Sequence, residues 1–141
     1  MSDIDVTQLR ADLKRDEGTV LHCYKDSKGL DTIGTGILID ARGGGISEYE
    51  ADFLLDNRIT RLIGNMDAKL PWLLTKSDGV QRALANMAFN LGLSGLLEFK
   101  DMLAKIQSGD YVGASEAALD SAWAKQVGDR ALRIASLIKM G

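Results

Sequence analysis

Residues 14–36 read KRDEGTVLHCYKDSKGLDTIGTG and connect a helical pattern to a pattern of short strands. Before this stretch, apolar residues recur three or four positions apart, which predicts an amphipathic helix that ends at Gly18. The apolar residues of this stripe are Val6, Leu9 and Leu13. The next position on the stripe is Glu17, where a core-facing row calls for an apolar side chain. A carboxyl group at that position is unusual, and it directs attention to the chemistry of this junction.

The residues after Gly18 predict a small antiparallel sheet. Three segments have strand character, and tight turns separate them. They are VLHCY at 20–24, LDTIG at 30–34 and TGILID at 35–40, with KDSKG between the first two and ARGGG after the third.

From Ser47 onward the pattern is helical. Ser47 and Glu50 have the spacing of a capping box, and Asp78 with Gln81 is predicted to cap a helix over 79–92 that is apolar nearly all round. Residues 70–76 predict a short helix or turn. Further helices are expected in 95–109, 110–126 and 129–140, with Gly92, Gly109 and Gly128 at the junctions.

These elements predict an α+β fold with two lobes. A small N-terminal lobe, about 14–63, would hold the three-stranded antiparallel sheet, and a larger all-α lobe would span about 64–141. We expect a cleft between the lobes, which is a common place for a ligand.

Composition excludes several classes of protein. Hydrophobic residues make up 45% of the 141 residues and charged residues 26%, as in an ordinary globular protein. The net charge of −3 argues against general nucleic-acid binding, and no apolar run is long enough to span a membrane. The start, MSDIDVTQLR, has no features of a secretory signal, and Cys23 is the single cysteine, so we expect synthesis in the cytoplasm. There are too few Cys and His residues for a structural zinc site, and we expect no metal.

Three polar residues around the predicted sheet form a candidate catalytic set. Glu17 lies on the apolar stripe, and a carboxyl group held partly out of water favours its protonated form, as a general acid requires. Asp26 lies in a polar turn where it should be ionised, and Thr32 has a hydroxyl that could hold a water molecule. This combination suits the hydrolysis of a glycosidic bond. The residues alone leave an ordinary alternative open, because a Glu at a helix end and an Asp in a turn before Gly are common structural features.

The spacing of these residues resembles that of the phage-type lysozymes, the T-even bacteriophage endolysin family of muramidases. The motifs RDEG (15–18), YKDSKG (24–29) and TIGTG (32–36) put eight residues between Glu17 and Asp26 and five between Asp26 and Thr32. The resemblance continues through ISEYEADFLLDNRI (46–59), ALANMAFNLG (83–92) and SAWAKQVGDRALRI (121–134). One departure is Ile37, where the family commonly has histidine. The resemblance implies a single lysozyme-like domain over 1–141, with the first helix packed on the C-terminal lobe.

The resemblance also implies a role for individual residues. Glu17 matches the general acid, Asp26 the carboxylate that supports the attacking water, and Thr32 the hydroxyl that positions this water. Leu38, Phe89 and Asn90 match residues that line the saccharide cleft. Arg130 matches an arginine that pairs with the catalytic glutamate, and Arg133 would pair with Asp16.

The implied function is that of a monomeric endolysin without a cofactor. It would hydrolyse the β-1,4 bond between N-acetylmuramic acid and N-acetylglucosamine in bacterial peptidoglycan with inversion, and so lyse the host cell. It would stay in the host cytoplasm, without inserting into the membrane, until the membrane is permeabilised. The alternatives are a lytic transglycosylase or chitinase of the same fold, and a wall-binding protein that has lost activity.

Four further residues are predicted to be structural. Cys23 is expected to be a buried strand thiol, and His22 a surface residue of the hairpin. Trp72 and Trp123 are expected to pack in the helical lobe and not to stack on sugars.

Overall fold

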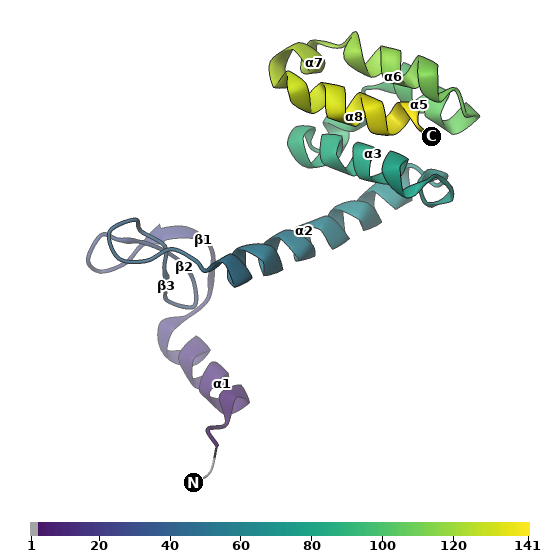
Figure 1. Ribbon diagram of the computed structural model, residues 1–141. Coiled ribbons are helices and arrows are strands. Elements are labelled where there is room, and N and C mark those ends of the chain that lie inside the picture. Colours follow the sequence, from purple (N-terminus) through teal and green to yellow (C-terminus); the bar gives the residue numbers. More distant parts are fainter. Residues whose placement is uncertain (1–2) are drawn as a thin grey trace. The chain divides into compact units, whose positions relative to one another are not determined.

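The computed structural model describes residues 3–141, and its backbone forms two compact units, Met1–Phe53 and Leu54–Gly141. We call them the N-terminal unit and the C-terminal unit. The first contains helix α1 and a three-stranded sheet, and the second contains helices (Figure 1). The boundary lies within helix α2, Glu48–Lys69. The predicted α+β fold with a small N-terminal sheet is confirmed. The predicted packing of the first helix on the C-terminal lobe and the predicted cleft concern the placement of the two units, and they stay predictions.

Helix α1, Val6–Glu17, has the predicted end. Asp5 caps its start, since the Asp5 carboxylate accepts a hydrogen bond of 3.0 Å from the backbone N–H of Gln8. Gly18 ends the helix with a φ of 73°, and its N–H donates to the carbonyl of Lys14.

The sheet has the order β1-β2-β3 and is antiparallel throughout, as predicted. The strands are β1 (Val20–Lys25), β2 (Asp31–Gly34) and β3 (Ile37–Leu38). In the register, Thr32 lies opposite Tyr24 on β1 and opposite Leu38 on β3. Thr32 is therefore on the central strand, and it is only 3% exposed.

The prediction of a buried thiol at Cys23 is wrong. Cys23 is exposed, as are Val20, Leu21 and His22 before it. The pairing of β1 with β2 is irregular between Val20 and Tyr24, so the two-residue alternation of a regular strand does not hold there. The prediction that His22 is a surface residue is confirmed.

Helix α2 starts with the predicted capping box. The N–H of Glu50 donates to the Ser47 hydroxyl at 3.1 Å, and the N–H of Ser47 donates to the Glu50 carboxylate at 3.0 Å. The N–H and hydroxyl of Ser47 both lower the pKa of Glu50, because they stabilise its charged form.

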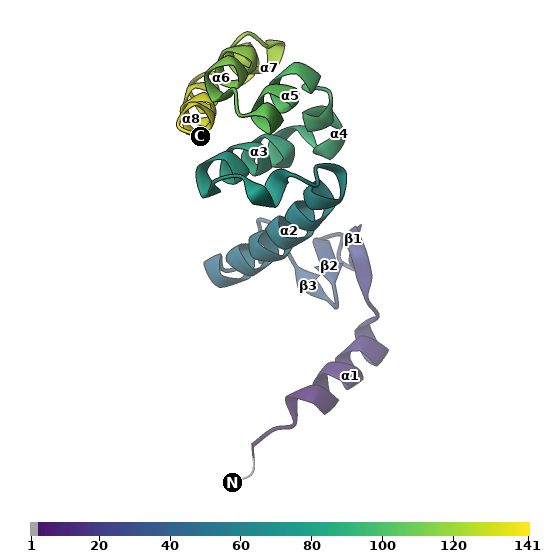
Figure 2. The same cartoon turned by 90° about the vertical axis from the view of Figure 1, so that its right-hand side faces the viewer.

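The C-terminal unit contains the rest of α2, a short 3-10 helix and six further helices. Helix α8 packs against α3, α6 and α7 (Figure 2). Gly92, Gly109 and Gly128 lie at helix junctions, as predicted. None of the described helices combines the length and hydropathy needed to cross a membrane. The helices are η1 (Leu73–Thr75), α3 (Asp78–Leu91), α4 (Leu93–Leu97), α5 (Lys100–Ser108), α6 (Tyr111–Leu119), α7 (Ala122–Val127) and α8 (Asp129–Lys139).

Helix α3 lies in the core of this unit, as its all-round apolar sequence predicts. Val80, Leu84 and Met87 are fully buried in it. Trp123 is 4% exposed, and its ring meets the edge of Phe99 at a centroid distance of 6.2 Å. Trp72 is half-buried against the same core, so both tryptophans pack as predicted.

The predicted cap of α3 is wrong by one residue. Ser77 is the N-cap, because its backbone is extended and its hydroxyl accepts a hydrogen bond from the N–H of Val80. Asp78 is the first residue inside the helix. The Gln81 side chain donates to the carbonyl of Lys76 and takes no part in a capping box.

Candidate functional site

Glu17 is the last residue of α1 and is exposed within the N-terminal unit. Leu9 and Leu13, on the same apolar stripe, are 38% and 45% exposed. The prediction that Glu17 lies partly out of water depends on the placement of the two units, and it stays a prediction. The Glu17 carboxyl nevertheless lies against the sheet. A Cβ atom built on Gly36, in the turn between β2 and β3, would lie 3.3 Å from Glu17 Oε2.

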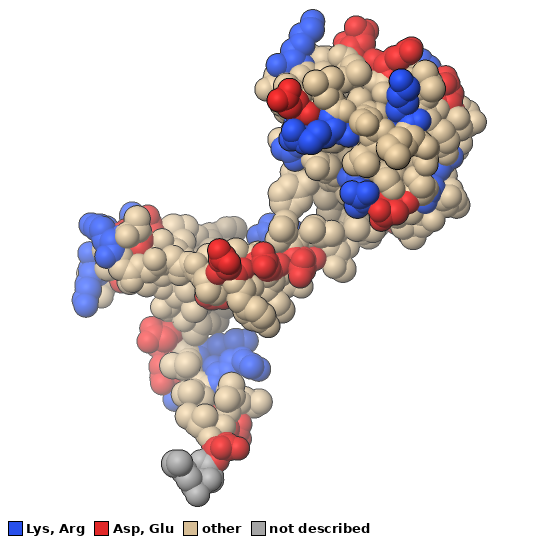
Figure 3. Space-filling model, in the orientation of Figure 1, with Lys and Arg blue, Asp and Glu red and all other residues tan. Residues whose placement is uncertain are grey.

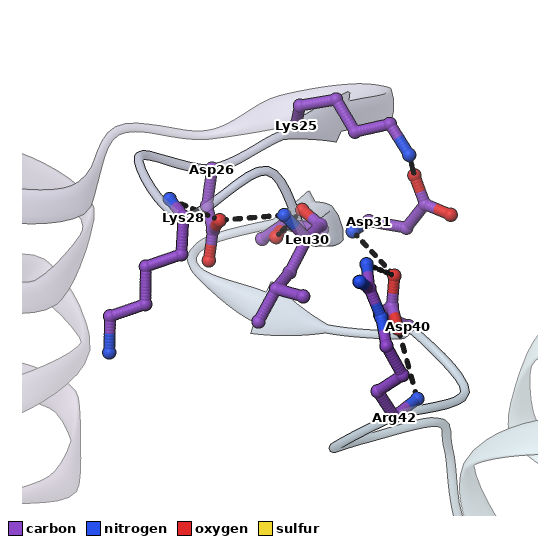
Figure 4. Close-up of polar contacts among 8 residues, drawn as sticks. Lys25, Asp26, Lys28, Leu30, Asp31, Asp40 and Arg42 are labelled. Carbon is purple, nitrogen blue, oxygen red and sulfur yellow. Dashed lines mark hydrogen bonds and ion pairs between the residues drawn. The ribbon is translucent and has the colours of Figure 1, made fainter.

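Asp26 and Thr32 are both held by the backbone of Leu30. The Leu30 N–H donates to Asp26 Oδ1 at 2.9 Å, and the Leu30 carbonyl accepts both the Asp26 N–H and the Thr32 hydroxyl at 2.9 Å (Figure 4). The N–H of Lys28 also donates to Asp26 Oδ1, at 2.8 Å. Among the described residues, no hydrogen bond is made by Asp26 Oδ2. One oxygen of Asp26 is therefore fixed by the turn, and the other is free to act on a ligand.

A second polar cluster follows the third strand and was not predicted. Asp40 is 7% exposed, and Arg42 forms a fork to it with two hydrogen bonds of 2.8 Å (Figure 4). Hydrogen bonds from Arg42 hold the pKa of Asp40 well below its usual range. The side-chain hydrogen bonds to Asp40 in turn raise the pKa of Arg42. Asp40 also accepts from the N–H of Asp31, which precedes Thr32. An Asp two residues before an Arg, followed by glycines, is the sequence signal that could have indicated this turn.

The neighbouring ion pair joins β1 to β2. Lys25 Nζ lies 2.5 Å from Asp31 Oδ1, and the two residues are opposite one another in the sheet. The Asp31 carboxylate raises the pKa of Lys25, first by hydrogen bonding and then by its charge. This pair and the Asp40 cluster fix the strand that carries Thr32 from both sides.

The C-terminal unit has a groove of about 340 Å³ between α2 and α3. Its lining is mostly apolar, from residues such as Ile59, Met66 and Phe89, and Phe89 is 53% exposed. Arg130 also lines the groove and donates to Asn86 Oδ1 at 2.8 Å. The polar residues of the lining are Asp78, Gln81, Arg82, Asn86 and Arg130.

Phe89 and Asn90 are adjacent in sequence but have different surroundings. Phe89 faces the groove, whereas Asn90 Oδ1 accepts a hydrogen bond of 2.9 Å from the indole N–H of Trp123. Asn90 is not part of the groove lining. Leu38, the third predicted saccharide contact, is on β3 and is half-buried.

Glu17, Asp26, Thr32 and Leu38 therefore all lie in the N-terminal unit. Asp26 and Thr32 share the Leu30 carbonyl, and Leu38 lies opposite Thr32 in the sheet. The predicted pairs of Glu17 with Arg130 and of Asp16 with Arg133 join the two units, and they stay predictions. Within α1, the Asp16 carboxylate pairs with the adjacent Arg15 at 2.9 Å.

Residues 3–141 contain no group of three or more His, Cys, Asp or Glu side chains placed to hold a metal ion. Basic and acidic side chains are interspersed on the face of the C-terminal unit that Figure 3 shows.

Comparison with known proteins finds a family whose model covers most of the chain. The family described as phage lysozyme has a model that matches residues 14–139, which include all the candidate residues named above. The chain belongs to the phage lysozyme family. The resemblance that the three motifs indicate is thus confirmed, and a lysozyme-like function is supported.

Relatives of this phage lysozyme family member include both long and short proteins. The pre-baseplate central spike protein Gp5 of Enterobacteria phage T4 is 31% identical over 92% of this chain, which spans only 27% of that protein's length. Probable T4-type lysozymes 1 and 2 of Dictyostelium discoideum are each 28% identical, over 96% of this chain and 96% of their own length.

Proposed function

We propose that this member of the phage lysozyme family hydrolyses the β-1,4 bond between N-acetylmuramic acid and N-acetylglucosamine in bacterial peptidoglycan. One observation carries the proposal. Asp26 and Thr32 are both hydrogen-bonded to the backbone of Leu30, and the Glu17 carboxyl, at the end of α1, lies against the turn between β2 and β3. An inverting glycosidase uses two carboxyl groups, one as general acid and one as the base that activates water.

In the proposed mechanism, Glu17 donates a proton to the glycosidic oxygen as the bond breaks. Asp26 Oδ2, which the turn leaves free, supports the attacking water and stabilises the positive charge on the sugar. The hydroxyl proton of Thr32 is directed to the Leu30 carbonyl, so its oxygen can accept a hydrogen bond from that water. Water attacks the face opposite the leaving oxygen, and the product has inverted configuration.

Three side chains have surfaces or groups free to contact a sugar in this proposal. Leu38 and Phe89 offer apolar surfaces to the sugar rings. Asn90 Oδ1 is occupied by Trp123, which leaves the amide NH₂ to donate to a sugar hydroxyl or acetamido group.

The proposed biological role is lysis of a bacterial host by a monomeric endolysin without a cofactor. The enzyme would remain in the host cytoplasm until the membrane is permeabilised, and would then act on the cell wall. The support is membership of the phage lysozyme family.

The test is the rate at which purified peptidoglycan is cleared by the parent protein and by Glu17→Gln. The amide keeps the shape of the side chain but has no proton to give, so we expect a loss of about 100-fold or more. Asp12→Asn, the same chemical change one turn earlier on α1, is the matched control and should clear walls at the parental rate. Equal clearing by Glu17→Gln and the parent would reject the proposed role of Glu17.

Product analysis separates the alternatives. New reducing ends with inverted configuration support the proposal, whereas anhydro ends would identify a lytic transglycosylase. Cleavage of chitin in preference to peptidoglycan would identify a chitinase. Binding to walls without release of any sugar would identify a protein that has lost activity.

A further inference from the structure

The end of α1 is attached to the turn between β2 and β3 by a pair of hydroxyl groups. Thr19 follows the helix stop at Gly18, and its Oγ1 lies 3.0 Å from Oγ1 of Thr35, in hydrogen-bond contact. Thr35 and Gly36 form the turn after β2. The two threonines are 16 positions apart in the sequence, so this contact fixes the helix end relative to the sheet.

The same turn gives space to the Glu17 carboxyl. Gly36 has a φ of 68°, and a Cβ atom there would lie 3.3 Å from Glu17 Oε2 and 3.4 Å from Glu17 Cδ. These distances are tighter than ordinary van der Waals contact, so a side chain at position 36 would push the Glu17 carboxyl away by a few tenths of an ångström. The positive φ also favours glycine at this position.

From these two contacts we infer that Thr19, Thr35 and Gly36 are positioning residues that hold the Glu17 carboxyl against the β2–β3 turn. The inference rests on the proposed function, because it assigns their effect on catalysis to Glu17. The hydroxyl pair sets the distance between the helix end and the turn, and Gly36 leaves the space that the carboxyl occupies. Glu17 is exposed in its own unit, so few other groups there restrain its side chain. The contacts with the β2–β3 turn therefore matter for where the carboxyl lies.

The hydroxyl pair is tested with Thr35→Val, which keeps the branched shape and removes the hydroxyl, and with Thr35→Ser, which keeps the hydroxyl. We expect Thr35→Val to lower kcat about 3- to 10-fold with KM unchanged, and Thr35→Ser to retain most of the parental kcat, since misplacement of a reacting group acts on the chemical step. Thr60→Val, on the exposed surface of α2, is the matched control. Equal kcat for Thr35→Val and Thr60→Val, or a change in KM alone, would overturn the inference.

Coupling provides a readout that a purely structural effect would not give. Because Thr19 and Thr35 act as a pair, Thr19→Val combined with Thr35→Val should cost no more than either single change. In a Glu17→Gln background, Thr35→Val should have no further effect on the residual rate. An additive double variant, or a full Thr35→Val effect without the Glu17 carboxyl, would contradict positioning through Glu17.

The space at Gly36 is tested with Gly36→Ala against Gly109→Ala. Both glycines have a left-handed backbone, with φ of 68° and 88°, but a Cβ on Gly109 would meet nothing within 4 Å. The backbone strain is thus similar, and only Gly36→Ala displaces the carboxyl. We expect kcat of Gly36→Ala to be about 10- to 100-fold below that of Gly109→Ala. Similar kcat in both variants would refute the role of Gly36.

Failure of this inference can be distinguished from failure of the proposed function. If Glu17→Gln clears walls at the parental rate, the proposed function itself is wrong. If Glu17→Gln is inactive while the threonine and glycine variants behave as their controls, Glu17 is catalytic but does not depend on this turn.

Discussion

Replacement of Thr32 with valine or serine separates the role of its hydroxyl in catalysis from its role in the fold. Thr32 is 3% exposed on the central strand, and its hydroxyl donates to the Leu30 carbonyl at 2.9 Å. Valine keeps the volume and removes the hydroxyl. Serine keeps the hydroxyl and removes the methyl group.

The structure sets the expected cost of each change. Thr32→Val loses one hydrogen bond, but the Leu30 carbonyl still accepts the Asp26 N–H, so no buried acceptor is left without a partner. The loss should be about 1 kcal/mol in the free energy of unfolding. Thr32→Ser loses one buried methyl group, which also costs about 1 kcal/mol. The two variants should therefore be equally stable.

Their activities should differ strongly. If Thr32 positions the attacking water, Thr32→Val should clear peptidoglycan about 10- to 100-fold more slowly than Thr32→Ser. Urea unfolding gives the stability of each variant, and initial clearing rates with matched amounts of folded protein give the activity. Rates within twofold of one another would show that the hydroxyl has no catalytic part, whatever its contribution to the fold.

Three more changes test the packing and charges of the molecule. Ile106→Ala removes a fully buried side chain of the C-terminal unit and should cost about 2–5 kcal/mol in thermal or urea unfolding. Trp123→Phe removes the hydrogen bond from the indole N–H to Asn90. Asn90 is exposed, so water can take the place of the indole as its partner. The loss of stability in the same measurement should be about 1–3 kcal/mol, the cost of one hydrogen bond and some packing. Arg42→Gln should destabilise the protein at pH 7, because Arg42 holds the pKa of Asp40 low. The stabilisation from this low pKa is present above the pKa of Asp40 in the unfolded chain, about 4, and is lost as the pH falls. Urea unfolding at pH 3 should therefore show a smaller difference in stability between Arg42→Gln and the parent protein.

Much of the fold could be predicted because its signals are local. The stop at Gly18 and the capping box of Ser47 and Glu50 each depend on a few adjacent residues. Two predictions failed where local sequence does not decide. Ser77 and Asp78 are both good capping residues, and the chain uses the first. Cys23 lies in a strand whose pairing is irregular, and alternation of apolar residues does not show irregular pairing.

The same distinction applies to the candidate site. The bonds that hold Asp26 span two to four residues, so the sequence KDSKG already predicts such a turn. The position of the Glu17 carboxyl depends on Gly36, which is 19 positions away in the sequence. Only the three-dimensional structure shows that these two residues are in contact. The apolar stripe was a good reason to notice Glu17, but a stripe shows which face of a helix is apolar and not what covers that face.

The distribution of buried groups explains why stability and catalysis should respond to different substitutions. Among the described residues of the N-terminal unit, Thr32 and Asp40 are the buried side chains, and hydrogen bonds hold both of them. All buried apolar side chains of the described chain lie at Met66 or beyond. The geometry of the proposed catalytic groups thus depends on hydrogen bonds around one sheet, and the apolar core stabilises another part of the chain. Ile106→Ala should accordingly lower the unfolding temperature while the activity of each folded molecule stays the same. Thr32→Val should lower the activity of each folded molecule and cost only about 1 kcal/mol in the free energy of unfolding.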